Sequence, residues 1–181
     1  MYEFYFALLL ILPVFIAGSL HMFIVAHNLF HALKVPIYRS KLGKNKTWRG
    51  VIMMPILSAV SLPLVVQFSL YLPKDYSLDP YFAIPVWVAG ILLGLFYIVF
   101  ELPNSYIKRQ LAIPEGKTVN GWRSIFIFFD QADSALGCVI LYALVTSISL
   151  NILIICFAFG SLIHLFANSL LFIVGLRKEP I

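Results

Sequence analysis

Charged residues are scarce in this chain. Only 12% of its 181 residues are Asp, Glu, Lys or Arg, whereas 61% are hydrophobic and the mean hydropathy is +0.95. Soluble domains carry roughly twice that share of charge, about 25%, so this composition excludes an ordinary soluble domain and predicts an integral membrane protein. A membrane chain this short has little surface for a soluble catalytic domain. We therefore expect any chemistry on charged substrates at the ends of the helices.

Cysteine and metal-ligand patterns are equally sparse. Cys138 and Cys156 fall inside apolar runs, where a thiol is usually a packing residue, so they predict neither a disulfide nor a metal site. The spacing of His21, His27 and His31 does not favour a metal site either.

Long apolar runs are what the sequence does have. Five runs approach the roughly 20 residues that a transmembrane helix needs, which predicts an all-α integral membrane protein with five transmembrane helices in one domain over 1–181. The expected spans are about 4–26, 51–72, 83–100, 134–150 and 152–174. Asn151 alone separates the last two, so a tight helical hairpin is expected there. The first run lacks a basic leader and a small-residue cleavage site, so we interpret it as a span. Gly90 and Gly94 form a GxxxG pattern, which favours close helix packing.

Basic residues are unevenly distributed among the expected loops. Apart from Lys74, every Lys and Arg falls in loops 27–50 and 101–133 or in the C-terminal tail. The positive-inside rule then places the N-terminus outside and the C-terminus in the cytoplasm. We expect a multi-pass protein of the cell (plasma) membrane whose active site faces the cytoplasm. Such a basic face attracts anionic headgroups and nucleotides, although it also serves as a topology signal alone.

Two acids form the most suggestive pair on that face. Asp130 and Asp133 are three residues apart, so on a helix their carboxylates share a face. Two carboxylates at a membrane boundary repel each other unless a cation joins them, and a hard divalent ion such as Mg²⁺ prefers oxygen ligands. The structural alternative is a helix N-cap with acids favoured by the helix dipole.

A polar stretch follows the third span. Glu101 is expected to end that span, and Pro103 to break the helix and return the chain to the membrane surface. An ionisable group at this depth indicates function, with interfacial snorkelling as the alternative. Ser105, Lys108 and Arg109 then bring a hydroxyl, an ammonium and a guanidinium within reach of phosphate oxygens.

The GKNKT segment at 43–47 has the composition of a phosphate loop. It lacks the GxxxxGK[ST] spacing and a preceding strand, so it is not a Walker motif. Backbone N–H groups at the start of the second span and the charge of Lys46 still predict phosphate binding. Thr47 also suits a helix N-cap. In the last span His164 and Asn168 share a face, where a hydrogen bond between helices is the structural explanation.

In this order, four elements resemble the CDP-archaeol synthase family over nearly the whole chain. They are GKNKTWRG at 43–50, SYIKR at 105–109, FDQAD at 129–133, and His164 to Asn168 with Gly175 and Pro180. That family is similar to the phosphatidate cytidylyltransferases, whose signature has Ser, Lys-Arg and a closing Asp-x-x-Asp in the same order. The resemblance implies Mg²⁺-dependent transfer of CMP from CTP to a phosphorylated glycerol diether, with release of pyrophosphate.

The motifs and the resemblance together assign three groups of site residues. The expected catalytic residues are Asp130, Asp133, Lys108 and Arg109; the expected substrate and nucleotide contacts are Asn45, Lys46, Thr47, Arg49, Ser105, His164 and Asn168; the expected metal ligands are Asp130 and Asp133 with Glu101. One departure from the family concerns Glu101, which stands where the family usually has Asp.

The expected partners are CTP, a membrane glycerol-phosphate lipid and the bilayer, and no nucleic acid. A lipid phosphate oxygen is already a nucleophile, so positioning and charge neutralisation are enough for this transfer. The alternatives are a phosphatidate cytidylyltransferase acting on an ester lipid, a CTP-dependent lipid or polyprenol kinase, and a small transporter or assembly factor. Against transport, the polar groups are expected at one face and not near the midplane.

Overall fold

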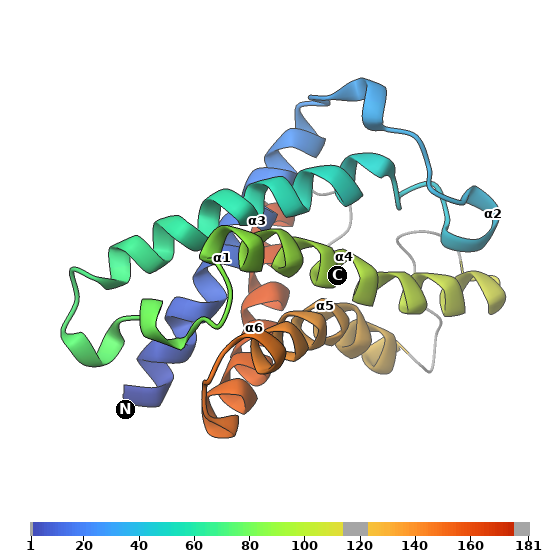
Figure 1. Cartoon of the computed structure of the whole chain (residues 1–181). Coiled ribbons are helices and arrows are strands. Elements are labelled where there is room, and N and C mark those ends of the chain that lie inside the picture. Colours follow the sequence, from blue (N-terminus) through green and yellow to red (C-terminus); the bar gives the residue numbers. More distant parts are fainter. Residues whose placement is uncertain (1, 114–122, 176–181) are drawn as a thin grey trace.

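The computed structural model describes residues 2–113 and 123–175 and is helical (Figure 1). The long helices are α1 Tyr2–Ala26, α3 Trp48–Ser69, α4 Val86–Gln110, α5 Arg123–Val145 and α6 Leu150–Ile173; the short elements are α2 Arg39–Leu42 and the 3₁₀ turns His31–Leu33, Lys74–Tyr76 and Asp79–Tyr81. Within these described residues, five helices are long and apolar enough to cross a membrane, which agrees with the expected number of spans. Lys117, Arg177, Lys178 and Pro180 lie outside the described residues.

The five long helices close into a ring. Helix α1 packs on α3, α3 on α4, α4 on α5, α5 on α6, and α6 returns to α1. All five contribute lining residues to one interior cavity of about 570 Å³. The ring of helices therefore encloses a cavity that is distinct from its outer surface.

Glycines set how closely α4 approaches its neighbours. A Cβ on Gly90 would lie 2.6 Å from the backbone of α3, and one on Gly94 would lie 2.5 Å from it. A Cβ on Gly137 of α5 would likewise lie 2.6 Å from the Phe96 carbonyl oxygen of α4. Distances this short leave no room for a side chain, so the close packing expected from the GxxxG pattern is confirmed.

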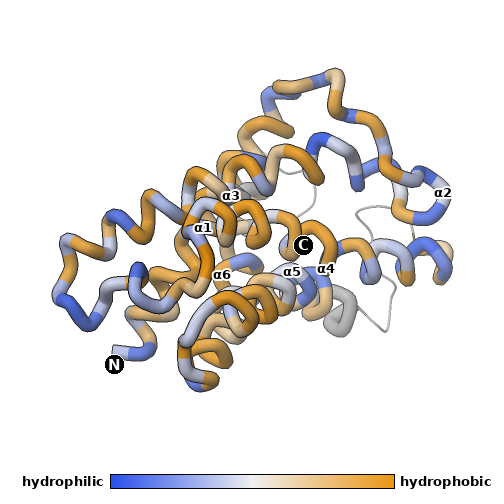
Figure 2. Tube along the Cα trace, viewed as in Figure 1, coloured by the Kyte–Doolittle hydropathy of each residue, from blue (hydrophilic) through white to orange (hydrophobic). Residues whose placement is uncertain are grey.

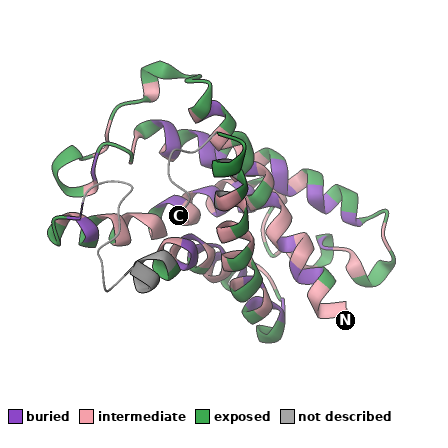
Figure 3. Cartoon of the chain, turned by 180° about the vertical axis from the view of Figure 1, so that it is seen from behind, coloured by how far each residue is buried: buried purple, intermediate pink, exposed green. Residues whose placement is uncertain are grey.

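The outer surface of the ring is apolar. Leu64 of α3 and Leu144 of α5 are 62% and 69% exposed, and the outward faces of the helices are largely exposed where the contacts between helices are buried (Figure 3). An apolar surface this extensive is typical of a protein that meets lipid. Hydrophilic positions gather mainly on the connecting segments and on the last turns of α4 (Figure 2).

The connecting segments meet at two opposite ends. At one end the start of α1 contacts the segment 70–85, with ring centroids of Tyr2 and Tyr76 5.4 Å apart. The 146–149 connection is bound there by Ser147 N–H, which donates to Tyr81 O at 3.0 Å. Segment 27–47 and the last turns of α4 lie at the other end (Figure 1). That end carries Lys34, Arg39, Lys41, Lys44, Lys46, Arg49, Lys108 and Arg109, whereas Lys74 is at the first end.

The prediction that the third span ends near residue 100 is wrong. Helix α4 does not stop near residue 100 but continues through Pro103 to Gln110. Pro13 in α1 and Pro63 in α3 also lie inside helices, because packed membrane helices tolerate proline when neighbouring groups compensate the freed carbonyl. Glu101 consequently lies inside a helix and not at its end.

The boundaries of the last two spans also differ from the expectation. Helix α5 begins at Arg123 and not at residue 134, so much of the expected loop 101–133 is helical. The turn before α6 lies at 146–149, which puts Asn151 inside α6. Hydropathy follows side-chain polarity and not the backbone, so it misses both the polar first turns of α5 and the short serine-containing turn.

Candidate active site

One face of α4 carries the first half of the site. Glu101, Asn104, Ser105 and Lys108 follow the i, i+3, i+4, i+7 pattern of a helical stripe, and all four line the interior cavity. The stripe exists because α4 remains helical through Pro103.

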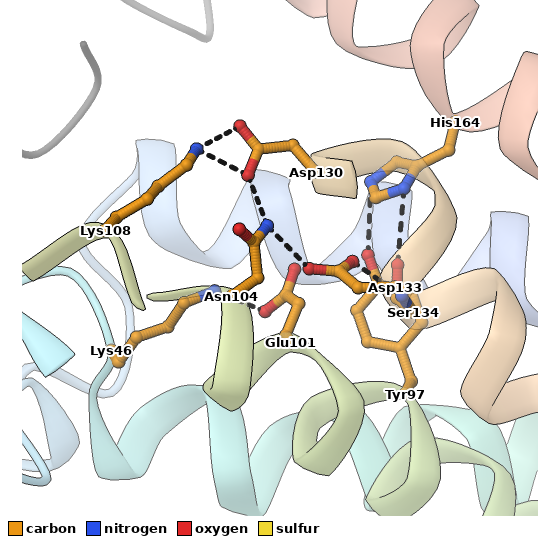
Figure 4. Close-up of polar contacts among 9 residues, drawn as sticks. All are labelled: Lys46, Tyr97, Glu101, Asn104, Lys108, Asp130, Asp133, Ser134 and His164. Atoms are coloured by element: carbon orange, nitrogen blue, oxygen red, sulfur yellow. Dashed lines mark hydrogen bonds and ion pairs between the residues drawn. The ribbon is translucent and has the colours of Figure 1, made fainter. Parts of the chain in front are cut away.

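Helix α5 supplies the facing half. Lys108 Nζ donates to Asp130 Oδ1 at 2.6 Å and to Oδ2 at 2.5 Å, and Asn104 Nδ2 donates to Asp130 Oδ1 at 2.6 Å and to Asp133 Oδ2 at 3.0 Å. Asp133 Oδ1 also accepts from the Ser134 backbone N–H at 2.6 Å. Figure 4 shows the two carboxylates pointing toward Asn104 from the same side of α5. The shared face is confirmed, and the N-cap alternative is wrong because both residues lie well inside α5.

A second ion pair joins the segment before α3 to α4. Lys46 Nζ donates to Glu101 Oε2 at 2.5 Å, and both side chains are about three quarters buried. Two lysines from different segments thus neutralise Glu101 and Asp130 in the same cavity. Charges buried this far from water are stable only when paired and hydrogen-bonded.

His164 connects three helices. From α6 its Nε2 lies 3.3 Å from the Tyr97 hydroxyl of α4, and its Nδ1 lies 3.4 Å from Ser134 Oγ of α5. This is the expected polar contact between helices, and Ser134 places it next to Asp133. The side chain of Asn168 lies outside the described residues.

The GKNKT segment is held by backbone pairing. Thr47 forms an antiparallel bridge with Pro36, and Trp48 N–H donates to Val35 O at 2.9 Å. Thr47 occupies the N-cap position of α3, but its side chain makes no capping hydrogen bond. The pairing uses the Trp48 N–H, so this N–H is not available to a phosphate, whereas Lys44, Asn45, Lys46 and Thr47 all line the cavity.

The remaining expected contacts line the same cavity. Asn45, Thr47, Arg49, Ser105 and Arg109 all contribute to its wall. Arg49 is only 3% exposed, and its Nη1 donates to Leu29 O at 3.1 Å. Every expected site residue whose side chain is described therefore borders one cavity.

A family model described as CarS-like, CDP-archaeol synthase, matches residues 1–180. The chain belongs to the CDP-archaeol synthase family. Members of this family are cytidylyltransferases of lipid biosynthesis, so the resemblance seen in the motifs is confirmed. No curated protein and no solved structure matches the chain.

The CDP-archaeol synthase assignment also bears on the transporter alternative. Glu101, Asp133 and His164 lie inside spanning helices, and the expectation that no polar group stands near the membrane midplane stays a prediction. What opposes transport is the family and the grouping of these side chains around a single cavity.

Two carboxylates of the site have the chemistry of metal ligands. Asp130 Oδ1 and Asp133 Oδ2 both accept from Asn104 Nδ2, at 2.6 and 3.0 Å, so two hard oxygen atoms of the kind that a divalent cation prefers lie close together. Within 2–113 and 123–175 no group of three or more His, Cys, Asp or Glu residues is arranged to hold a metal. Mg²⁺ commonly binds through one or two carboxylates and completes its shell with substrate phosphates and water.

Sequence reasoning missed three residues of this network. Tyr97 has the helical spacing to Glu101 that would have revealed it within the expected span, and Asn104 has such a spacing only if the helix extends through Pro103. Ser134 gave no such signal, since its partner His164 comes from a helix distant in the sequence.

Proposed function

We propose that this protein transfers CMP from CTP to a membrane glycerol-phosphate lipid of the archaeal diether type, giving a CDP-lipid and pyrophosphate. The observation that carries the proposal is the convergence of Asp130 and Asp133 on Asn104, with Lys108 beside them, in a cavity that is lined both by basic and by apolar side chains. The family supplies the reaction class.

The reaction needs no activated side-chain nucleophile. A non-bridging oxygen of the lipid phosphate attacks the α-phosphorus of CTP, a new P–O bond forms, and the bond from the α-phosphorus to the bridging oxygen of the β-phosphate breaks. The electron pair of that bond leaves with pyrophosphate. Catalysis is then a matter of orientation and of charge stabilisation.

The basic side chains have roles that follow from their positions. Lys46 and Lys108 each neutralise a carboxylate of the cavity. A triphosphate entering the cavity offers the same lysines stronger anionic partners, so they bind it and offset charge on the departing pyrophosphate. Arg109, whose guanidinium can form two parallel hydrogen bonds, is suited to the same phosphates.

Asp130 and Asp133 would hold Mg²⁺, and Glu101, which lines the same cavity, is proposed as a further ligand. When bound, the ion supplies positive charge next to the phosphates. Asn104 sets the separation of the two aspartates by donating to both.

The lipid chains reach the cavity from the bilayer. Leu10, Val14 and Gly18 of α1 and Gly160 of α6 form an apolar wall. A second cavity of about 660 Å³ lies between the same two helices and shares Ile11, Phe15 and Ile163 with the first. Hydrocarbon therefore has a continuous apolar path between α1 and α6.

The basic end of the ring is proposed to face the cytoplasm, where CTP is found, in the plasma membrane. The N-terminus would then be outside and the C-terminus inside. The support is the gathering of Lys and Arg at the end that carries the site.

Purified protein incubated with CTP and Mg²⁺ tests the proposal. A diether glycerol phosphate and a diacyl phosphatidic acid are offered separately, and products are resolved by mass. We expect CDP-lipid and pyrophosphate, with faster turnover of the diether. Formation of CDP with a newly phosphorylated lipid would identify a kinase instead, and faster turnover of the diacyl lipid would identify a phosphatidate cytidylyltransferase.

A further inference from the structure

His21 is a buried polar group that the proposed reaction does not yet use. It belongs to α1 and lines the interior cavity. Its Nε2 is buried and has no hydrogen-bond partner among the described residues. The ring lies against Gly50 of α3, where a Cβ would be 3.7 Å from Nε2. The charged groups that act on this ring belong to Glu101, Arg49 and Lys46.

Arg49 presents a second donor of the same kind. It immediately precedes Gly50, it is 3% exposed, and its Nε is buried without a partner in the described structure. Its Nη1 is committed to Leu29 O. Buried polar groups are nearly always hydrogen-bonded, so two buried nitrogens without a partner on adjoining helices of one cavity indicate a partner that comes from a ligand. Arg49 Nε–H is a donor, and His21 Nε2 is a donor in one of its tautomers and in the protonated ring.

The position of His21 along α1 indicates which ligand this is. Leu10, Val14, Gly18 and His21 follow the i, i+4, i+8, i+11 spacing of one helical face, and all line the cavity. Three apolar positions thus precede the imidazole over about 16 Å of helix. Such a wall suits a hydrocarbon chain that ends in an anionic group. Glu101 is paired with Lys46, which leaves the imidazole available for that group.

We propose that His21, together with Arg49, forms the subsite that binds and orients the phosphate monoester of the lipid substrate. This inference rests on the proposed function. His21 Nε2–H and Arg49 Nε–H donate to non-bridging phosphate oxygens, while Lys46, Lys108 and Arg109 remain for the triphosphate. His21 is a positioning residue for the nucleophile. It also selects phosphorylated lipid, because a site built to hydrogen-bond a group rejects analogues that lack it.

Steady-state kinetics with His21→Leu test the subsite. We expect the KM for lipid phosphate to rise about tenfold or more, as for the loss of a hydrogen bond to a charged group, while the KM for CTP changes less than about twofold. His21→Gln keeps an N–H donor and should recover most of the affinity. The matched control is His27→Leu, since His27 is exposed and bonds only to Phe23 O of its own helix in the described structure. An unchanged lipid KM in His21→Leu, or an equal rise in the KM for CTP, would overturn the proposal.

Thermal unfolding separates this role from a structural one. His21→Leu removes a buried unpaired nitrogen, so its midpoint should equal or exceed that of the wild type. A fall in the midpoint that accounts for the lost activity would mean that His21 acts only in packing. If the Leu variant does not fold, His21→Met is used with the same criteria.

Binding without turnover separates this inference from the proposed reaction. Radiolabelled diether phosphate is bound to the protein in detergent without CTP, and the unphosphorylated diether serves as the comparison. Binding that needs both the phosphate and His21, in a protein that forms no CDP-lipid, would support the subsite and reject the proposed function. CDP-lipid formation in a protein whose lipid binding does not depend on His21 would support the proposed function and reject the subsite.

Discussion

At the scale of single residues, Asn104 holds the arrangement of the site. Its one amide nitrogen donates to both aspartates, and so it brings together two carboxylates that otherwise repel each other. Lys108 compensates the charge of Asp130 from the next turn of α4. The neutral amide and the ammonium hold in place the oxygens that we propose as ligands of a cation.

Removing either aspartate charge should disable the reaction without unfolding the protein. Asp130→Asn and Asp133→Asn keep the size of the side chain but remove a hard anionic ligand, so turnover should fall at least ~10²-fold, about 2.7 kcal/mol of barrier. The measurement is the initial rate of CDP-lipid formation, with the thermal midpoint as the folding control. A folded variant that retains the wild-type rate would remove that residue from the mechanism.

Replacing Asn104 should make the protein depend on Mg²⁺ for its stability. In Asn104→Leu the two carboxylates lose their shared donor, so the midpoint without Mg²⁺ should fall and saturating Mg²⁺ should raise it by more than in the wild type, because a cation that binds the folded state stabilises it. Thermal unfolding with and without Mg²⁺ measures this. The matched control, Asn104→Leu with Asp133→Asn, should lose the extra response; a response that persists would place the ion elsewhere.

Lys46 and Arg109 should separate nucleotide from lipid recognition. Lys46→Ala is expected to raise the KM for CTP about tenfold and the KM for lipid much less, because an ammonium–phosphate contact contributes roughly that much. Arg109→Lys keeps the charge and loses activity only if the planar guanidinium makes a bidentate contact. Glu101→Gln combined with Lys46→Ala controls for the carboxylate that Lys46 leaves unpaired. Normal CTP dependence in Lys46→Ala would make Lys46 an orientation signal alone, whereas normal activity in Arg109→Lys would exclude the bidentate contact.

At the scale of the elements, the number of spans and the shared face of Asp130 and Asp133 could be predicted, because both follow from local periodicity. The extent of α4 could not be predicted, because a proline inside a helix usually ends it. Only packing against the other helices of the ring lets α4 continue through Pro103. For the same reason the stripe that includes Asn104 was not recognised. The contact of His164 with Tyr97 and Ser134 depends on how three helices meet, and nothing local in the sequence specifies that.

The tight contact between α3 and α4 gives a stability prediction with an internal control. In Gly94→Ala the new methyl would lie 2.5 Å from the α3 backbone, and such overpacking should cost about 1 to 3 kcal/mol. Gly18→Ala adds the same methyl in α1, where nothing lies within 4 Å, so the gain in helix propensity should leave stability equal or higher. Denaturant or thermal unfolding compares the two. Equal stability would show that α3 and α4 are not packed this closely.

At the scale of the whole molecule, the ring of helices encloses one cavity that we propose is reached both from water and from the lipid bilayer. Its basic end collects lysines and arginines that suit a nucleotide, and its α1 and α6 walls offer hydrocarbon a path from the bilayer. A water-soluble triphosphate and a lipid can then meet without either leaving its own phase. This arrangement works only if the basic end faces the compartment that contains CTP.

Cysteine labelling tests that orientation directly. Ser40 in α2 and Asp75 in the 70–85 segment are exposed at opposite ends of the ring. The native Cys138 and Cys156 are both buried and should contribute little background. In sealed cells an impermeant thiol reagent should label Asp75→Cys, whereas Ser40→Cys should react only after the membrane is opened, because the Lys and Arg residues retain the basic end in the cytoplasm. The opposite pattern would reverse the orientation and put the proposed CTP site on the wrong side. Labelling of both positions from one side would be incompatible with five spans, because an odd number of crossings separates the two ends of this ring.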